Sequence, residues 1–304
     1  MKRITLLLMA FILLCSCGQS FEEKRRLTKA EKQRLVKENA EALKIAVMPT
    51  LDCLPLYVAQ QLHLFDTLKV NVRLKPFTAQ MDCDTAIVGG SVEGVVSDLI
   101  RTEKLKKDGH ALDYLTSTVL EWQLLSNRRA RLRKIDQLGD KMIAMTRYSG
   151  TDYLTDRALQ GVKTNAQVFK VQINDVNIRL QMLLNNEMDA MWLPEPQATT
   201  ARLQKHLVLL ESNKLGEHLG VIAFRHISMK TKHRQQQLTL FEKGYNNAVD
   251  SINKNGLKYY SDLIVQFCGT KTSTVQSLPN IKFQKITQPL EANVEKARQY
   301  VSKL

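Results

Sequence analysis

The sequence predicts an α/β protein with two lobes, each built on a doubly wound, mostly parallel sheet. Short runs rich in β-branched residues alternate with helical patterns in two separate series along the chain. An extended run without a helix directly behind it stands between the two series, at 121–126, and another follows the second series, at 220–225. We therefore expect the chain to leave the first lobe, build the second and return, so that two strands form a hinge.

The first series begins at residue 44 and the second at residue 141. Strands are expected at 44–48, 70–77, 92–98, 141–146, 167–172 and 188–194. Helices are expected at 54–62, 83–88 and 99–107, then from about Thr151, Asp175 and Gln197, and in the tail at 230–254, 257–267 and 291–303. These elements predict lobe one from residues 44–126 and 220–304 and lobe two from residues 127–219.

The first residues are typical of a bacterial export signal. Lys2 and Arg3 precede an apolar run, Ile4–Leu14, that is too short to span a bilayer as a helix. The letters LCSC that end at Cys17 resemble the lipobox of bacterial lipoproteins, in which the last cysteine receives the lipid, including palmitate. We interpret residues 1–16 as a signal peptide and Cys17 as the lipidation site. The alternative is an ordinary secretory signal with incidental cysteines.

Residues 17–43 form a charged spacer with few large apolar side chains, which we interpret as a lipidated tether. Thr28 and Glu31 fit a capping box, so part of the tether is expected to be helical.

Removing the signal peptide lowers the count of basic side chains from 44 to 42, against 30 acidic ones, which leaves a net charge of +12. No basic stripe interleaved with aromatic residues accompanies this charge, so we expect scattered solubilising charge first, a basic face on anionic lipid second, and no nucleic acid.

Three cysteines remain after removal of the signal peptide and use of Cys17, namely Cys53, Cys83 and Cys268. None belongs to a C-x-x-C pair, and the histidines have no metal-ligand spacing. A disulfide between Cys53 and Cys83 is one reading, and small buried thiols are the favoured one. We expect no metal site.

Ligands of doubly wound sheets bind beyond the carboxyl ends of the strands, where loops meet helix N-termini. In lobe one, Asp52 lies in the loop after the first strand, and Ser97 and Asp98 end a later strand. The free backbone amides and the helix dipole at such a loop favour an acceptor group on a ligand. The alternative for these side chains is that they only cap the helices that follow.

In lobe two, Ser149, Gly150 and Thr151 lie at a helix start, where amides and hydroxyls are expected to hold an anionic or carbonyl group. Glu195 stands between two prolines that stiffen a turn, so its carboxylate is expected to face a cationic or hydrogen-bond-donating ligand. The alternatives are a helix cap and a solvated loop acid. Trp192 is expected to fill the core of lobe two.

These candidate residues conflict about the charge of the ligand. The stretch 149–151 suits an acceptor-rich group, whereas Asp52, Asp98 and Glu195 oppose a full anion. A zwitterion or a nitrogen heterocycle reconciles them better than a simple anion.

No Ser/His/Asp arrangement, Gly-rich phosphate loop or metal cluster is present in the sequence, so we expect neither catalysis nor a cofactor.

Several segments, in this order, resemble the solute-binding proteins of ABC importers in the sulfonate/nitrate/thiamine-precursor group: LKIAVMPTLDCLPLYVAQQLHLF, DTAIVGGSVEGVVSDLI, RYSGTDYLTDRAL and IRLQMLLNNEMDAMWLPEPQATTARL. The segment LGVIAFR is similar to the return strand of that group. The resemblance covers roughly residues 43–268. It implies a two-lobed, periplasmic-binding-protein-like clamp of type II that is not catalytic, and it adds Pro49, Thr50 and Leu51 to the expected cleft residues.

The expected function is therefore the membrane-anchored solute-binding component of an ABC importer, which captures a small polar molecule between its lobes. We expect a monomer in the cell envelope, anchored by its lipid and facing the periplasm or exposed on the outer surface, with a permease and an ATPase as partners. The alternatives are a ligand-sensing lipoprotein and a catalytically adapted enzyme of the same fold. The export signal opposes the enzyme, because the substrates of the related enzymes are cytosolic.

Overall fold

The computed structural model describes residues 29–304, in two units. The predicted signal peptide, residues 1–16, and the predicted lipidation site, Cys17, lie outside the described residues. The first unit contains helix α2 (Lys29–Glu41), which has ion pairs at i,i+4 spacing between Arg34 and Glu38 and between Lys37 and Glu41. The prediction that part of the tether is helical is therefore confirmed.

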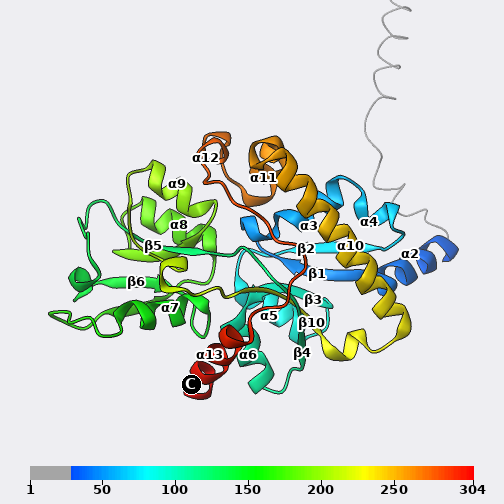
Figure 1. Ribbon diagram of the computed structural model, residues 1–304, viewed down its shortest axis with the longest axis horizontal. Coiled ribbons are helices and arrows are strands. Elements are labelled where there is room, and N and C mark those ends of the chain that lie inside the picture. Colours follow the sequence, from blue (N-terminus) through cyan, green and yellow to red (C-terminus); the bar gives the residue numbers. More distant parts are fainter. Residues whose placement is uncertain (1–28) are drawn as a thin grey trace, which may run out of the picture. The chain divides into compact units, whose positions relative to one another are not determined.

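The second unit, Leu43–Leu304, contains two five-stranded sheets of the same design. The first sheet has the strand order β2-β1-β3-β10-β4. Its strands are β1 (Leu43–Val47), β2 (Val72–Pro76), β3 (Gly94–Asp98), β4 (Leu112–Ser117) and β10 (Gly220–Arg225). Strands β2, β1 and β3 are parallel, and β10 is antiparallel to both β3 and β4. The helices of this part are α3 (Leu54–Gln61), α4 (Leu64–Thr67), α5 (Gln80–Val88) and α6 (Leu99–Lys107) (Figure 1).

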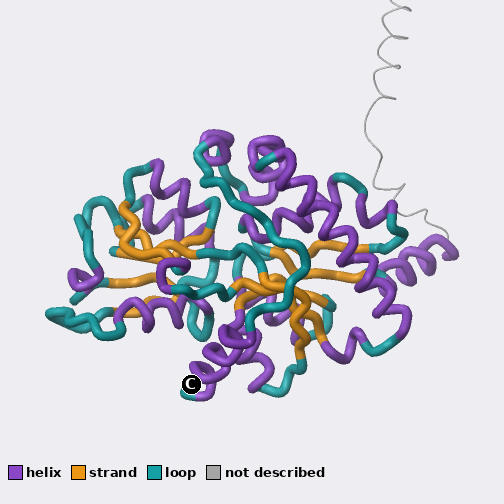
Figure 2. The backbone as a smooth tube through the Cα atoms, in the orientation of Figure 1, coloured by secondary structure: helices purple, strands orange, loops and turns teal. Residues whose placement is uncertain are grey.

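The second sheet has the order β7-β6-β8-β5-β9 and repeats this pattern, with one antiparallel strand, β5, beside three parallel ones. Its strands are β5 (Trp122–Ser126), β6 (Met142–Met145), β7 (Phe169–Gln172), β8 (Ala190–Pro194) and β9 (Leu207–Glu211), and its helices are α7 (Gly150–Leu159), α8 (Val176–Leu184) and α9 (Gln197–Leu203). Figure 2 shows the strands in two groups joined by loops. The predicted two-lobed α/β fold class is confirmed.

The position of β5 corrects one predicted boundary. Residues 122–126 were assigned to lobe one, but they form a strand of the second sheet that pairs with β8 and β9. The chain crosses between the sheets at 118–121 and again at 212–219. Backbone hydrogen bonds tie the two crossings together: Thr118 N–H donates to Gly220 O (2.8 Å) and Ser212 N–H donates to Trp122 O (2.9 Å).

The long helix α10 (Lys232–Asn255) returns to the first sheet and packs on α3 and α4. Its Phe241 is fully buried and stacks on Phe65, with ring centroids 5.4 Å apart, while the Phe224 ring of β10 meets it edge-on at 5.8 Å. Helices α11 (Ser261–Cys268) and α12 (Thr272–Gln276) follow. This aromatic cluster fixes the tail to lobe one.

The last helix, α13 (Glu291–Ser302), adds a third connection between the lobes that the sequence did not predict. It packs along α6 of lobe one, and its apolar face joins a core that contains residues of α7. The Tyr300 ring meets the Tyr153 ring of α7 edge-on at 5.0 Å, and the Tyr300 hydroxyl donates to Asp156 (2.7 Å). Any motion between the lobes therefore has to slide or break these contacts.

Two further findings concern the described part of the chain. Cys53, Cys83 and Cys268 are free and buried, so the favoured interpretation as buried thiols is confirmed. Burial raises the pKa of all three thiols, which makes them poor nucleophiles. Within residues 29–304, no helix has the length and apolar character needed to cross a bilayer.

We predict that mild proteolysis of the full chain cuts first before Leu43 and leaves residues 43–304 as one resistant fragment. The reason is that residues 43–304 form one compact unit, in which β5, β10 and α13 hold the two sheets together. The measurement is a time course followed by mass spectrometry of intact fragments. An early cut near residue 220 that released two independently stable halves would contradict the predicted insertion of lobe two into lobe one.

Candidate functional site

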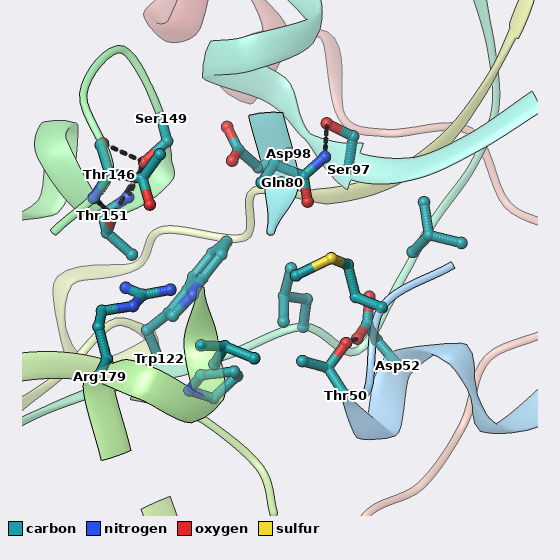
Figure 3. Close-up of a pocket in the computed structure, with 15 residues that line it drawn as sticks. Thr50, Asp52, Gln80, Ser97, Asp98, Trp122, Thr146, Ser149, Thr151 and Arg179 are labelled. Carbon is teal, nitrogen blue, oxygen red and sulfur yellow. Dashed lines mark hydrogen bonds between the residues drawn. The ribbon is translucent and has the colours of Figure 1, made fainter. Parts of the chain in front are cut away.

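A small cavity lies where the carboxyl ends of the parallel strands from both sheets face each other (Figure 3). The cavity has a volume of about 40 Å³. Since one water needs roughly 10–15 Å³ on this measure, the volume corresponds to a few waters. It is lined by Met48, Thr50, Asp52, Gln80, Val96, Ser97, Asp98, Leu120, Trp122, Thr146, Ser149, Thr151, Val176, Arg179 and Pro194.

Six of the residues predicted to bind ligand line this cavity. Those from lobe one follow β1 and end β3, and those from lobe two follow β6. They are Thr50, Asp52, Ser97, Asp98, Ser149 and Thr151. The expectation that strand ends bring these loops together is thus met by the geometry, and their binding role stays a prediction.

Three other predicted residues form contacts between the lobes instead of lining the cavity. Leu51 N–H donates to the carbonyl of Glu195 (2.9 Å), and the Gln197 side-chain amide donates to the carbonyl of Pro49 (2.9 Å). Both bonds join the loop after β1 to the turn after β8.

The Glu195 side chain is turned away from the cavity. Its carboxylate accepts from Thr199 N–H in the first turn of α9 (2.9 Å) and forms an ion pair with Arg202 (2.8 Å). The structure therefore contradicts the expectation that the two prolines present this acid to a ligand, because α9 begins close enough for the carboxylate to cap it.

Asp52 is buried in a short 3-10 helix, Leu51–Cys53, that precedes α3. Its carboxylate accepts from the hydroxyls of Thr50 (2.6 Å) and Thr118 (3.4 Å), and it does not cap α3. The alternative that Asp52 serves only as the cap of α3 is therefore wrong. Burial raises the pKa of this carboxyl to about 6, and hydrogen bonds oppose the rise.

Asp98 performs the capping role that was kept as an alternative, since its carboxylate accepts from Arg101 N–H at the start of α6 (3.0 Å). The same carboxylate also faces lobe two, where the backbone of Gly150 at the start of α7 favours its charged form. A Cβ on Gly150 would lie 3.3 Å from the Asp98 carboxyl carbon and 3.0 Å from the Trp122 ring. Gly150 thus allows the lobes to approach closely. Burial raises the pKa of Asp98 to about 6.

The hydroxyls of Ser149 and Thr151 are bonded mainly within lobe two. Ser149 Oγ donates to the carbonyl of Thr146 (2.6 Å) and accepts from Thr151 N–H (3.1 Å). Thr151 Oγ1 accepts from Thr146 N–H (2.9 Å) and lies 2.8 Å from Ser149 Oγ. Because a hydroxyl has one donor and two acceptor positions, the Ser149 hydroxyl is saturated by these partners. The hydrogen bonds of these two hydroxyls hold the turn between β6 and α7 in place.

Arg179, Gln80 and Trp122 line the cavity but were not among the residues predicted to bind ligand. Arg179 lies in the interior of α8, and Gln80 donates to Ser97 Oγ (3.2 Å) from the start of α5. The sequence of such short helices does not show which face points toward the cavity, so no local signal marks Arg179 or Gln80.

Trp192 is fully buried and donates to Thr155 (2.9 Å), which confirms its predicted place in the core of lobe two.

The described residues, 29–304, include no group of three or more His, Cys, Asp or Glu side chains placed to hold a metal ion. The fifteen residues around the cavity include no histidine, lysine or cysteine. Its ionisable groups are two carboxyls from lobe one and one guanidinium from lobe two.

Comparison with solved structures identifies the fold as that of periplasmic solute-binding proteins. The alkanesulfonate-binding protein SsuA of Xanthomonas axonopodis pv. citri, bound to MOPS, is 18% identical, covers 86% of this chain and 91% of its own, and has a TM-score of 0.71. The nitrate-binding protein NrtA of Synechocystis PCC 6803 is 11% identical, with 87% and 86% covered and a TM-score of 0.69. The desulfurization enzyme DSZB is 10% identical, with 86% and 91% covered and a TM-score of 0.61. No protein-family model and no curated protein matches the sequence.

We predict that the ligand-free protein loses stability as the pH rises from 4 to 6 and that Asp52→Asn with Asp98→Asn reduces this loss. Both folded pKa values, about 6, lie above the unfolded value of 3.8, so the folded state binds more protons between these values. The contribution is complete below pH 4 and is lost as the pH rises through 6. It amounts to up to about 3 kcal/mol per carboxyl.

The measurement is urea unfolding at several pH values, with Asp136→Asn, an exposed acid, as the matched control. The side chain of asparagine at position 98 still has an oxygen that can cap α6. A change in the pH profile of the double variant therefore does not come from loss of this cap. Parallel pH profiles for the wild type and the double variant would show that the two carboxyls are not perturbed.

Proposed function

We propose that this protein is the membrane-anchored solute-binding component of an ABC importer and that it captures a small polar molecule between its two lobes. The observation that carries the proposal is the cavity itself, which is surrounded by polar side chains from both lobes at the carboxyl ends of their strands. The fold shared with SsuA and NrtA, named as sulfonate- and nitrate-binding proteins, supports the same reading.

Capture requires the lobes to open, because the present cavity has room for only a few waters. The crossings at 118–121 and 212–219 are the segments about which the lobes would rotate. A solute that contacts one lobe alone has no differential affinity for the closed state. A solute that meets Thr50, Asp52 and Ser97 on one side and Arg179 on the other stabilises closure.

We propose a binding role rather than catalysis. The cavity has no histidine, lysine or cysteine, and the Ser149 hydroxyl, which would be its most obvious nucleophile, is saturated by neighbours that include no base. The likeness to DSZB means that the fold alone does not separate binding proteins from enzymes. The chemistry of the cavity favours binding.

The lipid on Cys17 would hold this clamp at the cell envelope, facing the periplasm or the outer surface, where a permease and an ATPase would receive the solute. We propose that the protein acts as a monomer. A sensor kinase copurifying with the protein in place of a permease would indicate a ligand-sensing lipoprotein instead.

We predict that binding changes the fluorescence of Trp122 but not that of Trp192, because Trp122 lines the cavity and Trp192 is enclosed in the core of lobe two. Compounds are first selected from a metabolite library by thermal shift. A compound present at 100 times its dissociation constant stabilises the protein by about 2.7 kcal/mol. Each hit is then titrated against wild type, Trp122→Phe and Trp192→Phe.

The saturable response should vanish in Trp122→Phe and persist in Trp192→Phe. Hits that stabilise the protein yet leave Trp122 fluorescence unchanged would place the binding site elsewhere. A library of polar metabolites that yields no hit would count against solute capture as such.

We predict that Cys17→Ala releases the protein from the membrane fraction or blocks its processing, whereas Cys15→Ala does neither. The acceptor cysteine of a lipobox follows a small residue, and Ser16 fits this requirement only for Cys17. The measurement is membrane fractionation with labelled palmitate. A Cys17→Ala variant that remains acylated and membrane-bound as the wild type does would refute the lipoprotein assignment.

A further inference from the structure

Two buried arginines of this protein differ in how their charges are balanced. Arg101 and Arg179 are 7% and 5% exposed, and burial lowers the pKa of each to about 10. Arg101 forms an ion pair with Asp84 and donates to the carbonyl of Arg147 (3.2 Å). Arg179 donates to the carbonyl of Trp192 (3.0 Å) and, within residues 29–304, forms no ion pair.

A buried cation without a paired anion is costly. The Nε atoms of both arginines are buried and, among the described residues, have no hydrogen-bond partner, so the missing ion pair is what sets Arg179 apart. Asp175 offsets part of the charge from a distance, but its carboxylate already caps α8 by accepting from Asn177 and Ile178 N–H. An unpaired buried charge costs several kcal/mol, so a charge at this position has a reason other than the stability of the ligand-free protein.

The geometry supplies that reason. Arg179 lines the cavity from lobe two, and Figure 3 shows its guanidinium directed toward Trp122 and Thr151. The opposite wall, from lobe one, carries the carboxyls of Asp52 and Asp98. The two walls that meet in the cavity therefore carry opposite charges, one guanidinium against two carboxyls.

We propose that Arg179 binds the anionic group of the solute and that the solute is a compact zwitterion whose cationic group faces Asp52 and Asp98. This inference rests on the proposed function and names its ligand class. A simple anion would bring its charge beside two carboxyls, and a simple cation or a neutral heterocycle would leave Arg179 unpaired. A planar guanidinium suits either a carboxylate or a sulfonate, so the shared chemistry is an oxyanion.

The first test needs no ligand. Arg179→Met removes an unpaired buried charge and should raise the melting temperature of the ligand-free protein by about 2 °C or more. Arg101→Met is the matched control, since it removes the partner of Asp84 and should lower the melting temperature. A melting temperature that falls in Arg179→Met as far as in Arg101→Met would overturn the proposal, because Arg179 would then be a structural residue.

The second test uses probes that differ only in charge. The full chain in mild detergent is titrated with β-alanine and taurine, which are zwitterions, with propionate and ethanesulfonate, which lack the amine, and with ethylamine, which lacks the anion. The same is done for each hit of the metabolite library. We expect the ligands that bind wild type to be zwitterions, to lose affinity by at least about tenfold in Arg179→Met, and to recover part of it in Arg179→Lys.

The outcomes separate this inference from the proposed function. Saturable binding at Trp122 by cations or neutral molecules, unchanged in Arg179→Met, would uphold solute capture and overturn the zwitterion. The same holds if the single-charge anions bind as tightly as the zwitterions. If no compound binds, solute capture fails, and the melting temperatures of Arg179→Met and Arg101→Met still decide whether Arg179 is an unpaired charge.

Discussion

Strand β10 lies between β3 and β4, and it reaches that position only after the chain has built the second lobe. Its residues pair with both neighbours, as Val221 does with Ser97 and Ser117. The first sheet is therefore incomplete without the return crossing, and β5 has the same place between β8 and β9 in the second sheet. In each sheet the strand next to a crossing, β10 or β5, lies between two other strands. The carboxyl ends of the parallel strands of one sheet therefore face those of the other. The cavity is a consequence of this arrangement.

The charges around the cavity work against the stability of the ligand-free protein. Asp52 and Asp98 have raised pKa values because they are buried, and Arg179 has a lowered one for the same reason. Apolar residues of similar volume would remove these costs. Such local conflicts between sequence and stability are expected at functional sites. Here the three side chains belong to two different lobes, so a ligand could pair with all three of them only when the lobes are closed.

The sequence predicts eight of the ten strands that the structure describes, including the edge strands β2 and β7, and misses the edge strands β4 and β9. Parallel strands covered on both faces form continuous apolar runs, so β1, β3 and β8 are the easiest to recognise. Loops at the carboxyl ends of strands can be located from strand order, which is why Asp52, Asp98 and Ser149 were found. The direction of a helical side chain depends on tertiary packing, so Arg179 was missed. For Glu195 the prolines were noticed, but the nearby start of α9, which binds its carboxylate, was not.

The contacts that join the lobes are both apolar and polar, since the two apolar clusters each contain residues of both lobes and hydrogen bonds add to them. Leu51 donates to the Glu195 carbonyl, Gln197 to the Pro49 carbonyl, and Val176 N–H to the Thr78 carbonyl (3.2 Å). Each bond replaces one with water, so its net contribution is only about 1 kcal/mol. The apolar contact of α13 with α7 adds to closure. Against these gains stand the buried charges of the cavity. In the proposed function, a solute that neutralises these charges in the closed state would shift the population toward it.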